Sequence, residues 1–177
     1  LEIVDLVLKY NSKPSFVNQN RHEGTALISA IRSDDLDIVK RLLSVPGIDP
    51  SLENMQGDNA FITAIMNYNL DIIDAIIDFY GDDIHNHAWI YKALQTLSRR
   101  MSNDNPRDIE WKVIQRIFKI KSIDLNFCDD YTFFYKACYC NQMEIVESFL
   151  SLDGIDVNKH EINSYQTPLM IAIDRKN

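Results

Sequence analysis

The sequence predicts an all-α solenoid, in which helix-turn-helix units stack side by side and short hairpin connectors join them. The phrase Gly-Ile-Asp, or a variant of it, follows an apolar segment four times, at 47–49, 81–83, 122–124 and 154–156. The glycines at 47 and 81 are 34 positions apart, and the apolar pattern of 36–49 reappears in register 107 positions later, at 143–156. A period of about 20 to 50 residues indicates a stacked array, because one such unit cannot bury its own apolar face.

The first complete repeat shows the plan of each unit. Thr25 is placed to cap a short helix over 25–31, whose apolar residues have spacings of three and four. A second helix of two to three turns is expected over 36–43, and Gly47 can end it in the left-handed conformation that other residues avoid. An extended, hairpin-like connector begins at Asp49.

The other copies follow the same plan. Helices are expected over 59–65 and 70–77 in the second copy, and over 132–138 and 143–150 in the fourth. A fifth copy begins over 167–173, and the pair Ile3-Val4 lies 35 positions before Ile38-Val39. We therefore expect partial repeats at both ends, and a chain that is a piece of something longer.

The third copy carries an insertion. Ala93 and Lys112 of this copy correspond to Ala30 and Asp37 of the first copy. The first pair is 19 positions apart and the second pair is 7 positions apart, so the third copy contains twelve inserted residues. We expect two lengthened helices joined by a polar turn near 102–106, with Asn105 as N-cap and Pro106 at the first helical position.

The opening Thr-Pro-Leu-Met-Ile-Ala at 167–172, its weaker copy at 25–30 and the Gly-Ile-Asp ending together resemble the ankyrin repeat family. The resemblance implies a single domain over 1–177, with a partial repeat at 1–18, repeats at 19–52, 53–84, 85–126 (insert about 95–107) and 127–158, and a partial repeat at 159–177. The family's histidine is replaced throughout, by Ile28, Ile62, Tyr91, Tyr135 and Met170, which predicts apolar packing between repeats.

The glycine that the family places between the two helices of a repeat is also replaced, by Asp34, Tyr68 and Asn141. Aspartate and asparagine tolerate the left-handed region, whereas tyrosine does so poorly. We therefore expect the turn at Tyr68 to be built differently.

The resemblance implies a non-catalytic protein-protein interaction module, in which hairpin tips and first helices form a concave surface that binds a partner protein. Tyr131, Tyr139 and Met66 are the expected apolar anchors. The partner-binding residues carried over copy by copy are Arg21, His22, Arg32, Met55, Gln56, Asp58, Met66, Asn67, Asp129, Tyr131, Tyr139, Asn163 and Gln166. The alternative is a regulatory or targeting array of a larger multidomain protein, whose catalytic activity lies outside this segment.

Two further features have two interpretations each. Arg99, Arg100 and Arg107 gather in the insert of an otherwise acidic chain. They form either a solvated helix end or a docking element for an acidic partner segment or for another domain of the same protein. Asn158 resembles the asparagine hydroxylation site seen in the ankyrin family, although such asparagines mostly serve as hairpin residues.

The sequence contains few residues that would suit a metal site or a catalytic site. The stretch 82–87 contains His85 and His87 beside two aspartates, but it fits a solvated, shortened hairpin better than a metal site, since no fourth ligand is fixed. Cys138-Tyr139-Cys140 lacks the spacing of a redox or zinc motif. No phosphate loop or nucleophile elbow is present. We expect no enzyme activity, no cofactor and no metal.

The amino-acid composition indicates which partners and which cellular compartment to expect. The 177 residues are 46% hydrophobic and 25% charged, which is ordinary for a folded protein, and the net charge of −8 opposes binding to nucleic acid or anionic membranes. The three cysteines are too few and too clustered to staple the fold, which favours a reducing compartment. We expect an intracellular, cytoplasmic monomer, with the nucleus left open.

Overall fold

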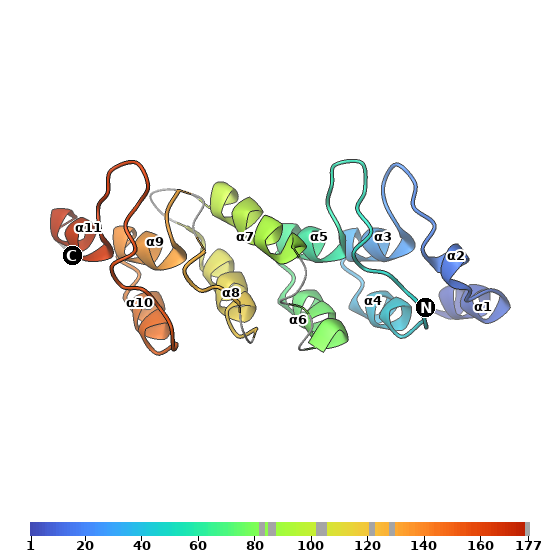
Figure 1. The fold of residues 1–177 in the computed structure, drawn as a ribbon. Helices are drawn as coiled ribbons and strands as arrows, with labels where there is room; N and C mark the ends of the chain where they lie inside the picture. The colour runs from blue at the N-terminus through green and yellow to red at the C-terminus, as the bar shows by residue number, and fades with distance from the viewer. Residues whose placement is uncertain (82–83, 85–87, 102–105, 121–122, 128–129, 176–177) are drawn as a thin grey trace. The chain divides into compact units, whose positions relative to one another are not determined.

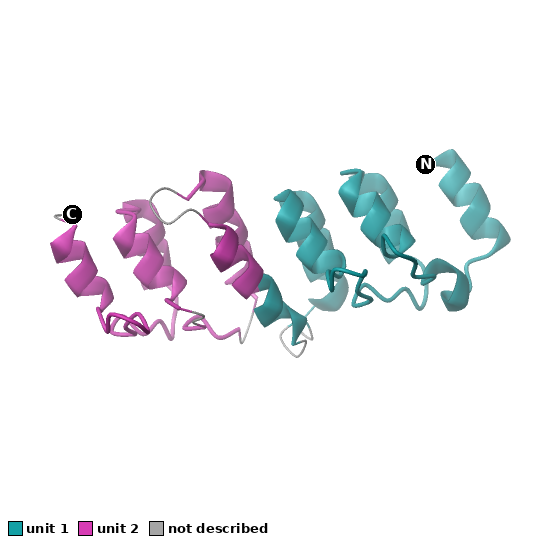
Figure 2. Cartoon of the chain, turned by 90° about the horizontal axis from the view of Figure 1, so that it is seen from above, with its two compact units in different colours: residues 1–93 teal, residues 94–177 magenta. Residues whose placement is uncertain are grey.

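The computed structural model describes residues 1–81, 84, 88–101, 106–120, 123–127 and 130–175, and within these ranges the protein is all-α (Figure 1). Its helices are α1 (Glu2–Tyr10), α2 (Pro14–Val17), α3 (Ala26–Arg32), α4 (Leu36–Leu43), α5 (Ala60–Asn67), α6 (Leu70–Tyr80), α7 (Trp89–Arg100), α8 (Asp108–Ile117), α9 (Phe133–Tyr139), α10 (Met143–Leu150) and α11 (Pro168–Asp174). No strand forms among the described residues, and the connector before α3 contains an isolated antiparallel bridge between Arg21 and Gly24. The chain divides into two compact units, Leu1–Ala93 and Leu94–Asn177, and the division falls within the sequence of α7 (Figure 2).

An equivalent N-cap position begins four of the helices, α3, α5, α9 and α11. The side chains of Thr25, Asn59, Thr132 and Thr167 each accept a hydrogen bond from the backbone N–H three residues later, at 3.0 to 3.3 Å. Such a cap satisfies one of the N–H groups that the first turn leaves unpaired. The predicted cap at Thr25 is therefore confirmed, and three further helices repeat it.

In the first unit, helix pairs α3/α4 and α5/α6 pack side by side. Helix α3 contacts α5 and α4 contacts α6, so first helices pack on first helices and second helices on second helices (Figure 1). Leu27, Ile31 and Ile65 of these helices are buried. Helix α1 packs along the outer side of α4, where Arg41 Nε donates to Asp5 Oδ1 at 2.5 Å.

The core of the second unit surrounds Phe149 of α10, which is fully buried. Trp111 of α8 lies 6.5 Å from it between ring centroids, Phe118 lies at 5.5 Å, and Phe134 of α9 lies at 6.3 Å. Helix α9 contacts both α10 and α11. Aromatic side chains such as these each bury a large apolar area, about 150 to 250 Å².

The expectation about Tyr68 is wrong. Tyr68 has φ +56°, as Asp34 has φ +58° and Asn141 φ +53°, so all three turns are built alike. The geometry is imposed from both sides: α5 and α6 pack against α3 and α4, and Asn69 caps α6 through a 3.0 Å bond from the Ile72 N–H. Packing and capping outweigh the local cost of about 1–2 kcal/mol that a side chain incurs in this region.

The insert forms the two longer helices that the sequence predicts, but the second begins elsewhere. Helix α7 has 12 residues where α3 and α9 have 7. Helix α8 begins at Asp108 with Arg107 as N-cap, so the placement of the helix start at Pro106 is wrong; Asn105 lies outside the described residues. The reason is Glu110, whose carboxylate accepts from the Arg107 backbone N–H at 2.8 Å and so fixes the first turn there.

Candidate functional site

In the first unit the predicted binding residues lie on two hairpin tips and on the ends of α3 and α5. Asn54 shapes the second tip, because its Oδ1 accepts from the N–H groups of Gln56 and Asp58, both at 2.9 Å. Met55 is thereby held at the apex with 71% of its surface exposed, and its sulfur lies against His22 of the neighbouring tip. Between the tips is a shallow hollow of about 560 Å³, lined by Asn20, Arg21, His22, Glu53, Asn54 and Met55.

Two of the predicted binding residues in this unit have structural partners. The Asn67 side chain donates to the carbonyl of Ile31 at 2.9 Å and so ties α5 to α3. Arg32 donates to the carbonyl of Glu23 at 2.9 Å and holds the hairpin against its own helix. Met66 is half-buried beside them. A partner would therefore meet Met55, Gln56 and His22 more readily than Asn67.

In the second unit, cationic and aromatic side chains alternate along α9 and its neighbours. The ammonium group of Lys136 lies 5.0 Å from the ring centroid of Tyr131 and 5.8 Å from that of Tyr139. The guanidinium of Arg175, just after α11, lies 3.7 Å from the Tyr139 ring. We call these four residues the tyrosine cluster. Lys136 is buried, whereas both tyrosines are half-buried and Arg175 is exposed.

The 161–166 hairpin borders the tyrosine cluster and is held by one carboxylate. Glu161 accepts from the backbone and side chain of Asn163, both at 2.9 Å, and from the Ser164 N–H at 2.5 Å. Hydrogen bonds from Ser164, and then from Asn163, lower the pKa of Glu161 to about 2. Gln166 accepts from the Tyr135 hydroxyl at 3.4 Å and donates to Asp174 at 2.7 Å. At neutral pH Glu161 is ionised, the form that accepts these hydrogen bonds.

The structure adds two residues to the predicted set and leaves one outside it. Asp129 lies outside the described residues, as does the neighbouring Cys128. Lys136 and Arg175 were not predicted, although Lys136 stands three residues before Tyr139 on the same helix, a spacing that places side chains on one face. Cys138 is half-buried, and this burial raises the pKa of its thiol to about 11.

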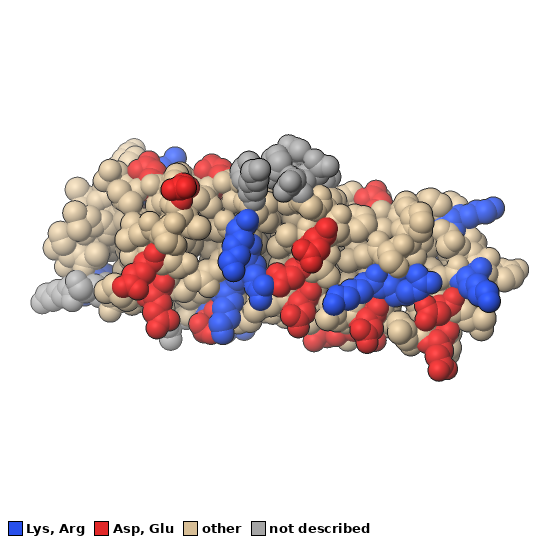
Figure 3. Space-filling model, turned by 90° about the horizontal axis from the view of Figure 1, so that it is seen from below, with Lys and Arg blue, Asp and Glu red and all other residues tan. Residues whose placement is uncertain are grey.

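Arg107 of the insert forms an ion pair with a buried carboxylate, and Arg99 and Arg100 lie at the exposed end of α7. Arg107 pairs with Glu110, from Nη2 to Oε1 at 2.8 Å; the Glu110 side chain is 3% exposed and the Arg107 side chain 61%. Arg99 and Arg100 are exposed at the end of α7. Figure 3 shows basic and acidic side chains interspersed on the face seen from below, without a field of one sign. Arg107 thus has a structural partner, which weakens its part in the docking hypothesis.

We expect Arg107→Ala to lower the free energy of unfolding by about 1–3 kcal/mol, because the buried Glu110 carboxylate loses its charged partner. Urea unfolding followed by circular dichroism measures the loss. Lys112→Ala is the control, since it breaks the Lys112–Asp108 pair on the same helix, at 2.7 Å but with both side chains exposed. That change should cost at most about 0.5 kcal/mol. Equal losses for the two variants would show that the Glu110 pair has no special role.

Asparagines bridge successive connectors at one repeated position. The Asn18 side chain donates to the Gly47 carbonyl at 2.8 Å and accepts from the Asp49 N–H at 2.9 Å. Asn126 does the same with Gly154 and Asp156, at 2.8 and 2.7 Å. Asn158 occupies the same position, is exposed, and donates its own N–H to Asp156 at 2.9 Å. Hydroxylation of Asn158 stays a prediction. The equivalent residues Asn18 and Asn126 have a structural role, because their side chains bridge successive connectors.

Several sequence features fall outside what the structure describes. The stretch 82–87 is described only at Ile84, so His85 and His87 cannot be placed. Across the described ranges, no cluster of three or more His, Cys, Asp or Glu side chains is arranged to hold a metal ion. None of the helices in the described part of the chain is both long and apolar enough to cross a membrane.

Comparison with known proteins does not assign a family. No protein-family model matches the chain, and no curated protein is similar to it in sequence.

Proposed function

We propose that the chain is a stacked array of ankyrin-type repeats that serves as a non-catalytic protein-binding module. Three features recur at repeat spacing and support the array. The N-caps occupy equivalent positions, Asp34, Tyr68 and Asn141 share the left-handed turn, and Asn18 and Asn126 make the same bridge. Repeats of this kind gain stability from contacts between neighbours and offer an extended surface for binding.

The tyrosine cluster is the observation that carries the binding function. Tyr131, Tyr139 and Arg175 form a partly exposed aromatic and cationic surface on one unit. Tyrosine and arginine are enriched among the residues that dominate binding energy at protein interfaces. The rings are held in place by Lys136 and Arg175, so a partner would meet a surface that is already ordered, which reduces the entropy cost of binding.

The test begins with a pull-down using the whole chain, followed by mass spectrometry, and then compares variants against any partner recovered. Tyr131→Ala together with Tyr139→Ala should weaken binding about 30-fold, which corresponds to about 2 kcal/mol, since central aromatic anchors carry most of the energy. Replacing both tyrosines by Phe keeps the rings over Lys136 and serves as the matched control. The Phe variant should keep most of the affinity.

The insert is the alternative binding site, and charge reversal at two of its arginines tests it against the same partner. Arg99→Glu together with Arg100→Glu leaves the Arg107–Glu110 pair intact and should change affinity little. If that charge reversal abolishes binding instead, and if added salt weakens the wild-type complex, the binding site is the insert and not the tyrosine cluster. Binding that survives both sets of substitutions would contradict both assignments.

A further inference from the structure

The two hairpin tips of the first unit, at 19–24 before α3 and at 53–58 before α5, are connected to each other around the hollow between them. Asn20 Nδ2 donates to the carbonyl of Glu53 at 2.7 Å and so joins the tips. The Glu53 carboxylate pairs with Lys92 at 2.9 Å, which compensates its charge. The hollow is therefore bounded by two connected tips, and its one carboxylate already has a cationic partner.

The second tip supplies a hydrogen-bond donor that has no acceptor. Asn54 lines the hollow and is 6% exposed, and its Oδ1 accepts from the N–H groups of Gln56 and Asp58. These two donors fix the orientation of the amide, because the reversed orientation would set its NH2 group against them. Nδ2 is consequently the free end, and it is buried without a hydrogen-bond partner. Asn59 Nδ2 is also buried and unpartnered, but Asn59 does not line the hollow. An acceptor that reaches Asn54 Nδ2 would remove the cost of the unmade bond.

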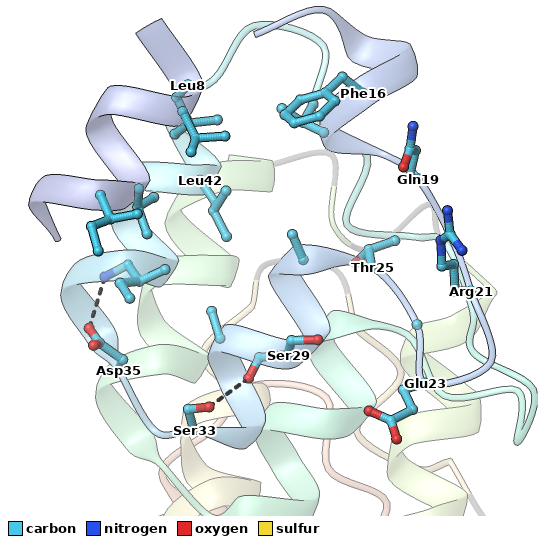
Figure 4. Close-up of a pocket in the computed structure, with 18 of the residues that line it drawn as sticks. Leu8, Phe16, Gln19, Arg21, Glu23, Thr25, Ser29, Ser33, Asp35 and Leu42 are labelled. Atoms are coloured by element: carbon cyan, nitrogen blue, oxygen red, sulfur yellow. Dashed lines mark hydrogen bonds between the residues drawn. The ribbon is translucent and has the colours of Figure 1, made fainter. Parts of the chain in front are cut away.

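The first tip adds a positive charge. Arg21 lines the hollow from the connector before α3 and is exposed. In Figure 4 the Glu23 carboxylate, two residues later on the same connector, is directed away from the Arg21 side chain. Within the described part of the chain, no ion pair engages the Arg21 guanidinium. Arg21 and Asn54 thus both offer hydrogen bonds to an oxygen acceptor, and the guanidinium favours a charged one such as a carboxylate.

Met55 gives the hollow an apolar edge. It is 71% exposed at the apex of the second tip, with its sulfur against His22. The flexible, polarisable side chain of methionine adapts to apolar groups of different shape. The net charge of −8 opposes acidic ligands in general, so an acidic segment that binds here does so through these local contacts.

We propose that this hollow binds the carboxylate of an aspartate or glutamate in an extended acidic segment of the partner protein, and that a neighbouring apolar side chain of the segment lies on Met55. Arg21 and Asn54 Nδ2 donate to the carboxylate oxygens. The inference rests on the proposed protein-binding function and names the chemistry that the first unit recognises, at a contact separate from the tyrosine cluster. A neutral amide in place of the carboxylate would lose the attraction to Arg21 and set its own NH2 group against the donors.

The test uses the ¹⁵N-labelled whole chain and two peptides, acetyl-Gly-Leu-Glu-Leu-Gly-amide and the same peptide with Gln in place of Glu, in NMR titrations. Asparagine side-chain amides give signals of their own, so the Asn54 NH2 group reports directly on the hollow. The Glu peptide should shift these signals and the backbone signals of 20–22 and 53–56. The Gln peptide should bind about tenfold more weakly, because hydrogen bonds to a charged acceptor are stronger.

Two variants test the two donors separately. Asn54→Asp keeps an oxygen for the N–H groups of Gln56 and Asp58 but puts a second oxygen where the donor was, so it should abolish binding. Arg21→Gln, at an exposed position, should weaken binding about tenfold. Lys159→Gln is the matched control, because it removes one exposed positive charge from a connector of the second unit. It should leave the affinity within about twofold, since surface changes away from a site are nearly neutral.

Three outcomes would overturn the proposal: no shift at 20–22 and 53–56 with the Glu peptide, equal affinity for both peptides, or equal losses for Arg21→Gln and Lys159→Gln. The last result would mean that the peptide responds to overall charge and not to the hollow.

The hairpin site and the tyrosine cluster fail separately in these experiments. Tyr131→Ala together with Tyr139→Ala should leave the peptide titration unchanged. A recovered partner that depends on the tyrosine pair, together with a Glu peptide that causes no shift, would reject the hairpin site alone. A Glu peptide that binds as expected, together with a partner that the tyrosine variants retain, would reject the tyrosine cluster alone.

Discussion

Replacing Gly47 by Ala should lower the free energy of unfolding by about 3 kcal/mol or more. Gly47 has φ +78°, a conformation that side-chain-bearing residues rarely adopt. An added Cβ would also lie 2.6 Å from the Pro14 Cγ of α2, and the proline ring cannot rotate away. Backbone strain and overpacking therefore act together at this one position.

Gly154→Ala is the matched control for this prediction, because it changes the same position of another repeat. Gly154 has φ +92°, but nothing lies within 4 Å of the added Cβ. Only the backbone strain remains, at about 1–2 kcal/mol. Chemical denaturation of both variants separates the two contributions. Equal losses would show that the contact between α2 and the Gly47 turn does not stabilise the fold.

Ala64→Leu and Ala137→Leu should each cost about 1–3 kcal/mol, because a larger side chain is forced between closely packed helices. Both alanines are 0% exposed, on α5 and α9 respectively. The measurement is the shift of the thermal midpoint of each variant. For a chain of this size a loss of 1 kcal/mol lowers the midpoint by about 2–4 °C.

The control for the alanine variants is Ala26→Leu, because Ala26 of α3 is exposed whereas Ala64 and Ala137 are fully buried. That substitution should leave the midpoint nearly unchanged. An unchanged midpoint for both Ala64→Leu and Ala137→Leu would mean that the repeat positions have been assigned wrongly.

Local features of the sequence predicted the helices well. Period and capping residues placed α4 at 36–43 and the N-cap at Thr25, because both depend on neighbours within one turn. Tyr68 could not be predicted in this way, since its left-handed φ is imposed by packing of α5 and α6 against other helices. The sequence placed the start of α8 at Pro106, because Asn105-Pro106 is a typical helix start. The helix begins at Asp108 instead, because Arg107 donates hydrogen bonds to Glu110, three residues later.

The candidate site was predictable only in part. The sequence pointed to Tyr131 and Tyr139 as surface residues of one repeat, and the structure places both within 6 Å of Lys136. Arg175 belongs to the following repeat, so its contact with Tyr139 depends on how α11 packs on α9, which no local pattern specifies.

Hydrogen exchange, measured peptide by peptide, tests most directly the claim that the chain is a stacked array stabilised by neighbours. Ile3 and Leu6 of α1 are 78% and 69% exposed, and Leu169 and Ile173 of α11 are 69% and 65% exposed, so these helices have few buried contacts. Residues 1–10 and those after Thr167 should therefore exchange before 38–43 and 145–150, which contain the buried Val39, Leu42 and Phe149. Uniform protection from one end to the other would contradict the account, because a single cooperative globule would then describe the protein better.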